Sequence, residues 1–425
     1  MESKIKAKTW IVFVLIGLFG QLAWSVENMY LNVFLYNTII QSTSYIAAMV
    51  AASAVTATLT AFIMGAVADK SGKRKAFISV GYILWGISTG AFGFINNSII
   101  KSASLAAMMV VILDCIMTFF GSTANDAAFN AYVTENTDES NRGKVEGVLS
   151  TFPLLSMLII FGLFDPLTQR GEWKSFFLIF GGANIVAGIA ALFLVSDEKA
   201  VKKEEDVIKG ILKLFTISEI KTHRERYLTL VTFGCFNIAL QVYLPYLIIY
   251  IQHYLGFNNY ALMLAVVLVG ASLASIIAGR IIDKIGKSQM CLIAGFIMLV
   301  GLISVYLTRS YISVMIAALI MMSGYMITFS SLGAKIRDIT PKHLTGSFQG
   351  IRMIFQVALP MIIGPMIGNA VIKGSGTYTE LGEVKNIPTP NIFLASAIVL
   401  LITAIFVFML IKEENKNGIS STTRA

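Results

Sequence analysis

The stretch "GAVADKSGKRKAF", residues 65–77, places four cations between two long apolar segments, and part of it recurs in the second half of the chain. "GAVADKSGK" at 65–73 aligns with "GRIIDKIGK" at 279–287 at a constant offset of 214 residues (279 − 65). The matched residues are Gly65, Asp69, Lys70, Gly72 and Lys73 with Gly279, Asp283, Lys284, Gly286 and Lys287. A landmark that returns at a fixed, long offset indicates an internal duplication.

A second, weaker repeat lies further along each half. "NTDESNRGKVEG" at 136–147 aligns with "ITPKHLTGSFQG" at 339–350 at an offset of 203 residues (339 − 136). The matched residues are Thr137, Gly143 and Gly147 with Thr340, Gly346 and Gly350. Each copy follows the fourth long apolar segment of its half, so the position of the repeat supports the duplication.

The composition shows which solvent surrounds the chain. Of its 425 residues, 56% are hydrophobic and 13% are charged, whereas soluble domains carry about 25% charged residues. A spanning helix needs about 20 mainly apolar residues, and twelve segments meet this requirement. They are 10–36, 43–68, 76–95, 104–131, 144–164, 174–195, 228–252, 260–281, 289–307, 311–334, 347–370 and 391–412.

These segments are continuously apolar rather than alternating, which favours helices over a membrane barrel. The longest polar connection, 196–226, divides the spans six and six, and its residues 207–215 fit a short amphipathic helix on the membrane surface. We therefore predict an all-α membrane protein with a bundle at 1–195, a cytoplasmic linker at 196–226, and a second bundle with a tail at 227–425.

The distribution of cations predicts the orientation. With a cytoplasmic N-terminus, 26 of the 33 Lys and Arg residues lie on the inside and six lie in outside loops, while Arg352 falls within a span. By the positive-inside rule both termini are cytoplasmic, and we expect a multi-pass protein of the cell membrane. This bias explains the net charge of +9, so the charge does not indicate a nucleic-acid partner. The three cysteines lie within spans and no CxxC pair exists, so no metal or other cofactor is expected.

The pattern G-x-x-x-D-[RK]-x-G-[RK]-[RK], present as Gly65, Asp69, Lys70, Gly72, Lys73 and Arg74, resembles the signature loop of the major facilitator superfamily. The resemblance covers nearly the whole chain and implies two pseudo-symmetric six-helix bundles that work by alternating access. At the first Arg position of the family pattern this chain has Lys70, which is a small departure. The resemblance also implies a cytoplasmic gate in which Asp69 meets the N-terminus of the helix near Gly346; the alternative is a simple topology anchor.

The expected gate includes further residues with open alternatives. Asp126 is expected to join the network with Arg142, or else to be an interfacial carboxylate without a special partner. Arg352 either pairs with a gate carboxylate or snorkels to the surface. The complete predicted gate set is Gly65, Asp69, Gly72, Lys73, Arg74, Asp126, Arg142, Asp283 and Arg352.

Polar stripes mark the candidate substrate surface of the first half. Gln21, Ser25, Asn28 and Asn32 recur at helical spacing in the first span, with Trp24 on the edge and Glu27 on the flank. In the fourth span Asp114, Thr118, Gly121 and Asn125 share one face. A cavity face explains this density better than hydrogen-bond glue between helices. Because a mid-span carboxylate is costly unless it is paired or faces water, Glu27 and Asp114 are the candidate coupling sites.

The second half is less charged. Asn237 and Gln241 share a face of the seventh span, and Gln241 is the counterpart of Glu27 at the 214-residue offset. A tyrosine stripe on another face, including Tyr246, either presents hydroxyls to a solute or serves packing and interface anchoring. In the eleventh span Gln349, Arg352 and Gln356 lie along one side. The predicted substrate residues are Gln21, Trp24, Asn28, Asn32, Thr118, Asn125, Asn237, Gln241, Tyr246 and Gln356.

Amides, hydroxyls and aromatic rings suit a hydroxyl-rich solute such as a sugar or glycoside. The segment "GLFGQLAWSVENMYLNVFLY", residues 17–36, resembles the sugar-transporting branches of the superfamily, including glycoside–pentoside–hexuronide cation symporters. That branch places acids in the second helix, whereas residues 43–68 contain none, so a proton is favoured over sodium as the coupling ion. The expected protein is a monomeric secondary transporter.

Other functions remain as alternatives. An exporter of amphipathic drugs or lipids, or an uncoupled facilitator, would share this fold. A membrane enzyme or a sensor is the rival from a different class, but the sequence has no HExxH pair and no phosphate-binding loop, so we do not expect an enzyme.

Overall fold

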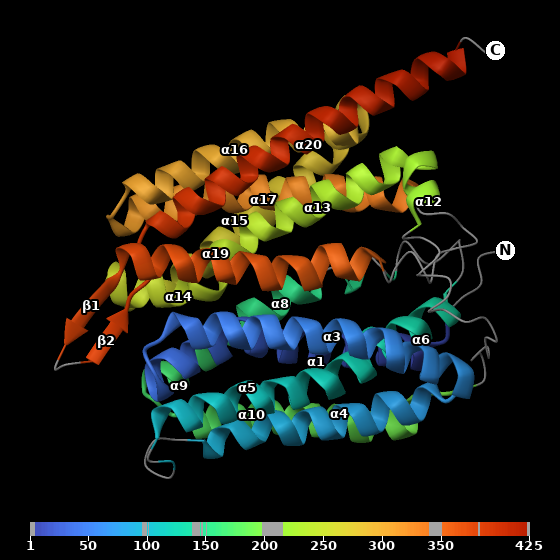
Figure 1. The fold of residues 1–425 in the computed structure, drawn as a ribbon. Coiled ribbons are helices and arrows are strands. Elements are labelled where there is room, and N and C mark those ends of the chain that lie inside the picture. The colour runs from blue at the N-terminus through green and yellow to red at the C-terminus, as the bar shows by residue number, and fades with distance from the viewer. Residues whose placement is uncertain are drawn as a thin grey trace. The chain divides into compact units, whose positions relative to one another are not determined.

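The computed structural model describes residues 5–95, 100, 102–137, 145, 148–149, 151–197, 216–339, 351–380 and 383–422. Contacts within the chain separate two compact units, Met1–Asp206 and Val207–Ala425, and each unit is described by itself. Both units are built of long helices (Figure 1).

The described residues of unit 1 form six membrane-length helices, several of which are interrupted by wider π-helical turns. Their segments are α1 (Ala7–Ser25), η1 (Val26–Leu31), α2 (Asn32–Phe34) and η2 (Leu35–Ile39); α3 (Thr43–Ser71); α4 (Arg74–Ala91) with the 3₁₀ turn η3 (Phe92–Phe94); α5 (Ala103–Gly121), η4 (Ser122–Phe129) and α6 (Asn130–Glu135); α8 (Phe152–Ile159), η5 (Ile160–Phe164) and α9 (Asp165–Gln169); and α10 (Trp173–Leu194).

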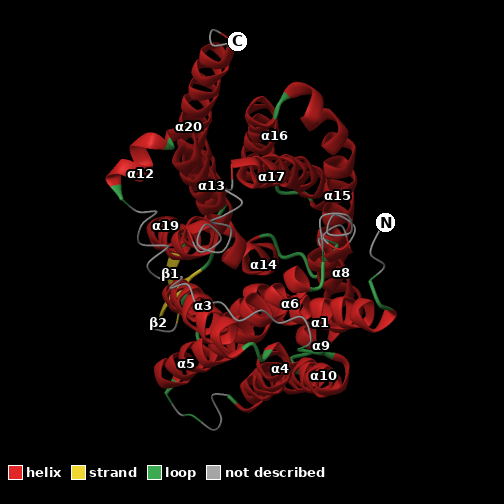
Figure 2. Cartoon of the chain, turned by 90° about the vertical axis from the view of Figure 1, so that its right-hand side faces the viewer, coloured by secondary structure: helices red, strands yellow, loops and turns green. Residues whose placement is uncertain are grey.

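In unit 2 the part of the chain that the structure describes forms a further six membrane-length helices, preceded by the short α12 (Ile217–Thr222). Their segments are α13 (Arg224–Tyr243), η6 (Leu244–Tyr246), α14 (Leu247–Ile249) and η7 (Tyr250–Tyr254); α15 (Tyr260–Ile285); α16 (Lys287–Leu307); α17 (Tyr311–Ile339); η9 (Ile354–Ala358) and α19 (Leu359–Ser375); and α20 (Asn391–Thr422). Figure 2 shows the helices in red and one small pair of strands in yellow.

Twelve of these helical stretches are long and apolar enough to cross a membrane, so the predicted number of spans is confirmed. The boundaries agree within a few residues for most spans; the fifth was expected from 144 and is described as a helix from Phe152. Large apolar side chains such as Leu163, Phe193 and Ile276 lie exposed on the outside of their units. In water such surfaces would be unfavourable, whereas a bilayer solvates them.

The strands were not predicted. β1 (Thr377–Glu380) and β2 (Glu383–Asn386) pair antiparallel, with Thr377 opposite Asn386, and the hairpin leaves the end of α19 (Figure 1). At its base the Ile387 amide donates to the Gly376 carbonyl at 3.0 Å. A Cβ on Gly376 would lie 2.0 Å from the Ile387 carbonyl oxygen, so glycine is required there. Strands of four residues give too short a pattern to be recognised in a sequence.

Glycines allow α4 and α10 to pack backbone against backbone. A Cβ on Gly181 would lie 2.5 Å from the Gly86 carbonyl oxygen, and one on Gly188 would lie 2.7 Å from that of Ser79. In unit 2, α16 and α17 approach each other in the same way at Gly301. Membrane helices lack a hydrophobic driving force between them, so close packing of small residues holds them together.

Candidate functional site

A cluster of carboxylates lies inside unit 1. Glu27 on η1 is 6% exposed, and the Thr118 hydroxyl on α5 donates to its Oε1 atom at 2.9 Å. Asp114, one turn away on α5, is 1% exposed and is hydrogen-bonded by the Ser53 side chain of α3. Glu27 interacts electrostatically with both Asp114 and Asp126. The fold therefore brings together the two predicted coupling residues, Glu27 and Asp114.

The π turn η1 positions Glu27, and the fifth membrane helix holds this turn at both ends. Ser25 and Ser156 of α8 share a hydrogen bond of 2.8 Å, and the Tyr30 hydroxyl donates to Asp165 Oδ1 at 2.8 Å. Asp165 also accepts a 2.6 Å hydrogen bond from the Gln169 amide. Sequence reasoning missed Asp165, although an acid before a proline at a helix start is a recognisable first-turn signal.

Three buried oxygen atoms in this region have no hydrogen-bond partner in the described part of the chain: Glu27 Oε2, Asn32 Oδ1 and Asp114 Oδ1. An unsatisfied buried acceptor costs about 1–3 kcal/mol. A carboxyl group that takes up a proton becomes a donor, and it then needs no counter-charge. Within the described residues no group of three His, Cys, Asp or Glu side chains is arranged to hold a metal ion. Each of these two carboxyl groups can therefore hold a proton on its unpartnered oxygen.

The polar residues of the stripe predicted in the first span form two kinds of hydrogen bond. Ser25 shares a hydrogen bond with Ser156 of α8, as expected for a polar residue that joins two membrane helices. The amides of Asn28 and Asn32 instead donate to their own helix, to the carbonyls of Trp24 and Asn28, each at 2.8 Å. Their amide oxygens therefore remain oriented away from the helix backbone. Gln21 is half-buried on the same helix.

Aromatic rings lie about one turn from the carboxylates. Trp24 packs against the fully buried Trp85 of α4 with ring centroids 4.9 Å apart. Gly121 makes room for the pair, because a Cβ there would lie 2.8 Å from the Trp85 ring. Asn125 packs against the Gly20 backbone, where a Cβ would lie 2.8 Å from its amide nitrogen. Trp24 is the half-exposed member of this group.

In unit 2 the predicted polar residues are mostly engaged in packing. The Asn237 amide donates to the Phe233 carbonyl at 2.8 Å, and the fully buried Tyr246 donates to the Pro365 carbonyl at 2.8 Å. Gln241 lies against α19. A Cβ built on Gly364 of that helix would lie 2.5 Å from the Cβ of Gln241. This geometry corresponds to the packing alternative for Tyr246.

On η9 and the residues before it, a second polar pair is half-buried. Arg352 Nε donates to Gln356 Oε1 at 2.9 Å. This bond joins residues one turn apart on the same helix, so it orients the guanidinium along the helix face.

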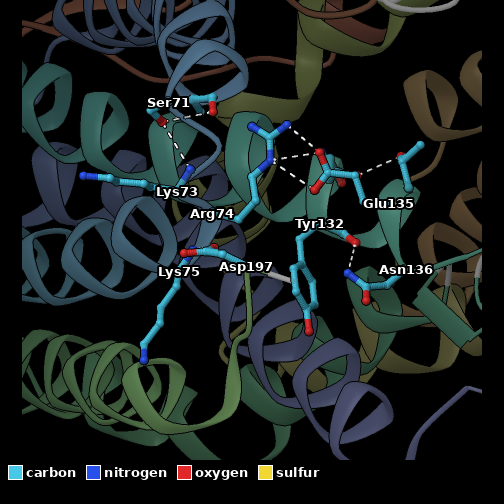
Figure 3. A network of polar contacts seen from close by, with 11 residues as sticks. Ser71, Lys73, Arg74, Lys75, Tyr132, Glu135, Asn136 and Asp197 are labelled. Atoms are coloured by element: carbon cyan, nitrogen blue, oxygen red, sulfur yellow. Dashed lines mark hydrogen bonds and ion pairs between the residues drawn. The ribbon is translucent and has the colours of Figure 1, made fainter. Parts of the chain in front are cut away.

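The basic loop after α3 is tied into unit 1. Gly72 ends α3 in the left-handed region with φ 65°. The buried Arg74 pairs with Glu135 of α6, with 2.7 Å between Nη2 and Oε1, and Figure 3 shows the guanidinium pointing at that carboxylate. The Lys75 amide donates to Asp197 Oδ1 at 2.7 Å. Glu135 and Asp197 are partners that the sequence alone did not reveal.

The structure describes only some of the other residues that were predicted to form the gate. Gly65 lies against η4, where a Cβ would be 3.9 Å from Ala127 Cβ, and Lys73 is exposed. The side chains of Asp69 and Asp283, and all of Arg142, lie outside the described residues. Asp126 accepts a hydrogen bond from the Ser122 hydroxyl at 2.9 Å and forms no ion pair with a described residue.

Comparison with known proteins shows which family and which solved structures this chain is similar to. Residues 10–365 match the family model described as Major Facilitator Superfamily. The chain is similar to the crystal structure of the nucleoside transporter NupG, with a TM-score of 0.70 and 12% identity over 96% of this chain and 99% of that one. A bacterial homolog to the human lysosomal transporter Spinster, in an inward-facing and occupied conformation, has a TM-score of 0.72 and 13% identity over 96% and 97%. The search of curated protein sequences found no match.

Proposed function

Because the chain belongs to the Major Facilitator Superfamily, we propose that it moves a small hydroxyl-rich solute by alternating access and that protons bound at Glu27 and Asp114 drive this transport. The family match and the solved transporters indicate a transporter rather than an enzyme. The observation that carries the proposal of proton coupling is the buried cluster of Glu27, Thr118 and Asp114, with an unpartnered oxygen on each carboxyl group among the described residues.

The case for a proton rests on charge. No described Lys, Arg or His forms an ion pair with Glu27 or Asp114. An ionised carboxylate in such a setting is costly unless water or a cation reaches it. Protonation removes that cost while the site is closed, and water removes it when the site opens. Proton binding is therefore linked to the state of the transporter, and through that state to the solute.

The case for the solute rests on the groups around the cluster. Gln21, Asn28 and Asn125 offer amides, and Trp24 offers an aromatic face beside them. Amides exchange hydrogen bonds with hydroxyl groups in both directions, and an apolar pocket with a few polar groups is the usual form of a solute site. Sugars, glycosides and nucleosides all present hydroxyls on a ring, and the similar NupG protein is a nucleoside transporter.

The proposed setting is the cell membrane with both termini in the cytoplasm, since 26 of the 33 Lys and Arg residues then lie inside. In this orientation the loop around Lys73 and Arg74 is cytoplasmic. The solute site of the proposal lies at mid-span, where Glu27 and Trp24 are found.

The test is uptake by the purified protein in liposomes, with and without an imposed pH gradient, over a panel of hexoses, glycosides and nucleosides. The unmodified protein should accumulate at least one of these solutes against its gradient. Glu27→Gln keeps the shape and the bond to Thr118 but removes titration, so accumulation should be lost while solute exchange partly remains. Glu172→Gln, which neutralises an exposed carboxylate before α10, is the matched control and should behave as the unmodified protein does.

Two results would overturn this proposal. If Glu27→Gln still accumulates solute, Glu27 is not the coupling residue, and Asp114→Asn is to be measured in the same assay. If the unmodified protein responds to neither a pH nor a sodium gradient, it is an uncoupled facilitator.

A further inference from the structure

Polar side chains recur at a spacing of four residues in the middle of the fourth membrane helix, from residue 114 to residue 126. Asp114, Thr118, Ser122 and Asp126 are spaced four residues apart, and carboxylates stand at the two ends of the row. The first three are almost fully buried, whereas Asp126 is half-buried. The row therefore begins in the interior of unit 1 and ends at a carboxylate that is partly exposed on the surface of this unit.

Hydrogen bonds and charges join this row to Glu27. The Thr118 hydroxyl donates to Glu27, and the Ser122 hydroxyl donates to Asp126, each at 2.9 Å. Asp114 and Asp126 are twelve residues apart, which is about 18 Å along a helix. Because both interact electrostatically with Glu27, Glu27 lies beside the middle of the row.

The π turn η4 keeps Asp126 in line. In a straight α-helix each step of four residues drifts by about 40°, so a row of four residues would wind away from Glu27. The wider π turn from Ser122 onward shifts the register in the opposite sense. π turns are frequent at functional sites, and this one carries both Ser122 and Asp126.

The groups that surround Asp126 contain no described cation in contact with it. Tyr82 of α4 and Glu27 of η1 interact with it electrostatically. The helix α3 approaches η4 at Gly65, and α1 approaches it at Gly20. A carboxylate held by one hydroxyl and faced by another acid is suited to exchanging a proton rather than to fixing a salt bridge.

We propose that this row carries protons between the Glu27–Asp114 pair and the cytoplasmic side, with Asp126 as the last protein group before water. The inference rests on the proposed proton coupling. On release, the Glu27 carboxyl group gives its proton to a water molecule that enters when the site opens. This water gives a proton to the Ser122 hydroxyl as that hydroxyl gives its own proton to the Asp126 carboxylate, to which it is hydrogen-bonded. Asp126 then gives its proton to water and becomes a carboxylate again, so the row is unchanged at the end.

The experiment separates proton movement from solute movement in the same liposomes. An internal pH dye reports solute-induced proton flux, and labelled solute reports exchange at equal pH. Asp126→Asn keeps the contact with Ser122 but cannot carry a proton, so the proton flux should fall roughly tenfold or more while exchange is retained. Asp126→Glu should restore the flux. Asn130→Ala is the matched control, because the side chain of this exposed residue, one turn further on, donates to the Asp126 backbone carbonyl and not to its carboxylate.

The outcomes are distinguishable. Unchanged proton flux in Asp126→Asn, in a protein whose unmodified form is coupled, would overturn the relay alone. Loss of both flux and exchange without rescue by Asp126→Glu would make Asp126 a gate residue instead. Should Asp126→Asn fail to fold, Ser122→Ala tests the same path, and normal flux in it would refute the row. Absence of any proton flux in the unmodified protein would refute the proposed coupling and the relay with it.

Discussion

Four buried ionisable side chains in unit 1 fall into two kinds. Arg74 and Asp165 are held by charged or polar partners, Glu135 in one case and Tyr30 with Gln169 in the other. Glu27 and Asp114 each keep one buried oxygen without a described partner. An opposite charge or several donors hold a buried charge in one state, whereas carboxyl groups that face each other, as Glu27 and Asp114 do, cannot all ionise without a large cost. At the scale of residues, the first pair is therefore suited to stabilising the fold, and the second pair is suited to the proposed proton binding.

The first prediction at this scale concerns the Arg74 ion pair. Glu135→Gln removes the charge that faces a buried guanidinium, so the free energy of unfolding should fall by about 1.5–3 kcal/mol. The measurement is thermal unfolding in detergent, with Glu172→Gln as the surface control. A melting temperature equal to that of the control would mean that this pair contributes nothing to stability.

At the scale of elements, the helices were predictable and their contacts were not. Hydropathy alone places twelve spans because a bilayer requires long apolar helices. Helical spacing likewise placed Glu27 near Asn28, but the partner Thr118 lies 91 residues away. A single sequence does not show which helices lie next to each other. It also gives no sign of the π turn at Val26–Leu31, which sets the direction in which Glu27 points. The partners Glu135 and Asp165 were missed for the same reason.

A second prediction belongs to the packing of α4 on α10. Gly181→Ala places a methyl group 2.5 Å from the Gly86 carbonyl, so the helices must separate, and stability should fall by about 1–3 kcal/mol. Gly182→Ala is the matched control, because nothing lies within 4 Å of its Cβ position. It should be neutral or slightly stabilising, since alanine favours a helix by up to about 1 kcal/mol. Equal melting temperatures for the two variants would contradict the close packing.

At the scale of the whole molecule, the two units each have their own interior and their own buried groups, and the fold is that of the superfamily. Among the side chains that the structure describes, the buried carboxylates Glu27, Asp114 and Asp165 lie in unit 1, whereas in unit 2 Gln241 stands at the repeat position of Glu27. The duplication could be predicted from the loop that recurs at 65–73 and 279–287, because both copies keep the same glycines. The sequence did not reveal which of the buried polar groups would lack a hydrogen-bond partner, because that depends on contacts between helices far apart in the chain.

The orientation gives the last prediction. In a variant without Cys115, Cys235 and Cys291, a single cysteine at position 101 or 385 should react with an impermeant thiol reagent added to intact cells. A cysteine at position 73 or 203 should react only after the cells are opened, because the proposed orientation puts the Lys- and Arg-rich side, to which these positions belong, in the cytoplasm. External labelling at position 73 would reverse the orientation and remove the basis for a cytoplasmic relay.

The π turns have a consequence for how the carboxylates can move. Each π turn contains one residue more than an α turn, and that surplus residue can migrate along the helix as hydrogen bonds exchange one at a time. Migration by one position rotates the side chains in between by about 100°, while both ends of the helix keep their places. Glu27 on η1 and Asp126 on η4 lie within such turns, whereas α4 and α10 run as uninterrupted α-helix. Such a shift would therefore rotate Glu27 or Asp126 about its helix axis while the neighbouring helices stay fixed.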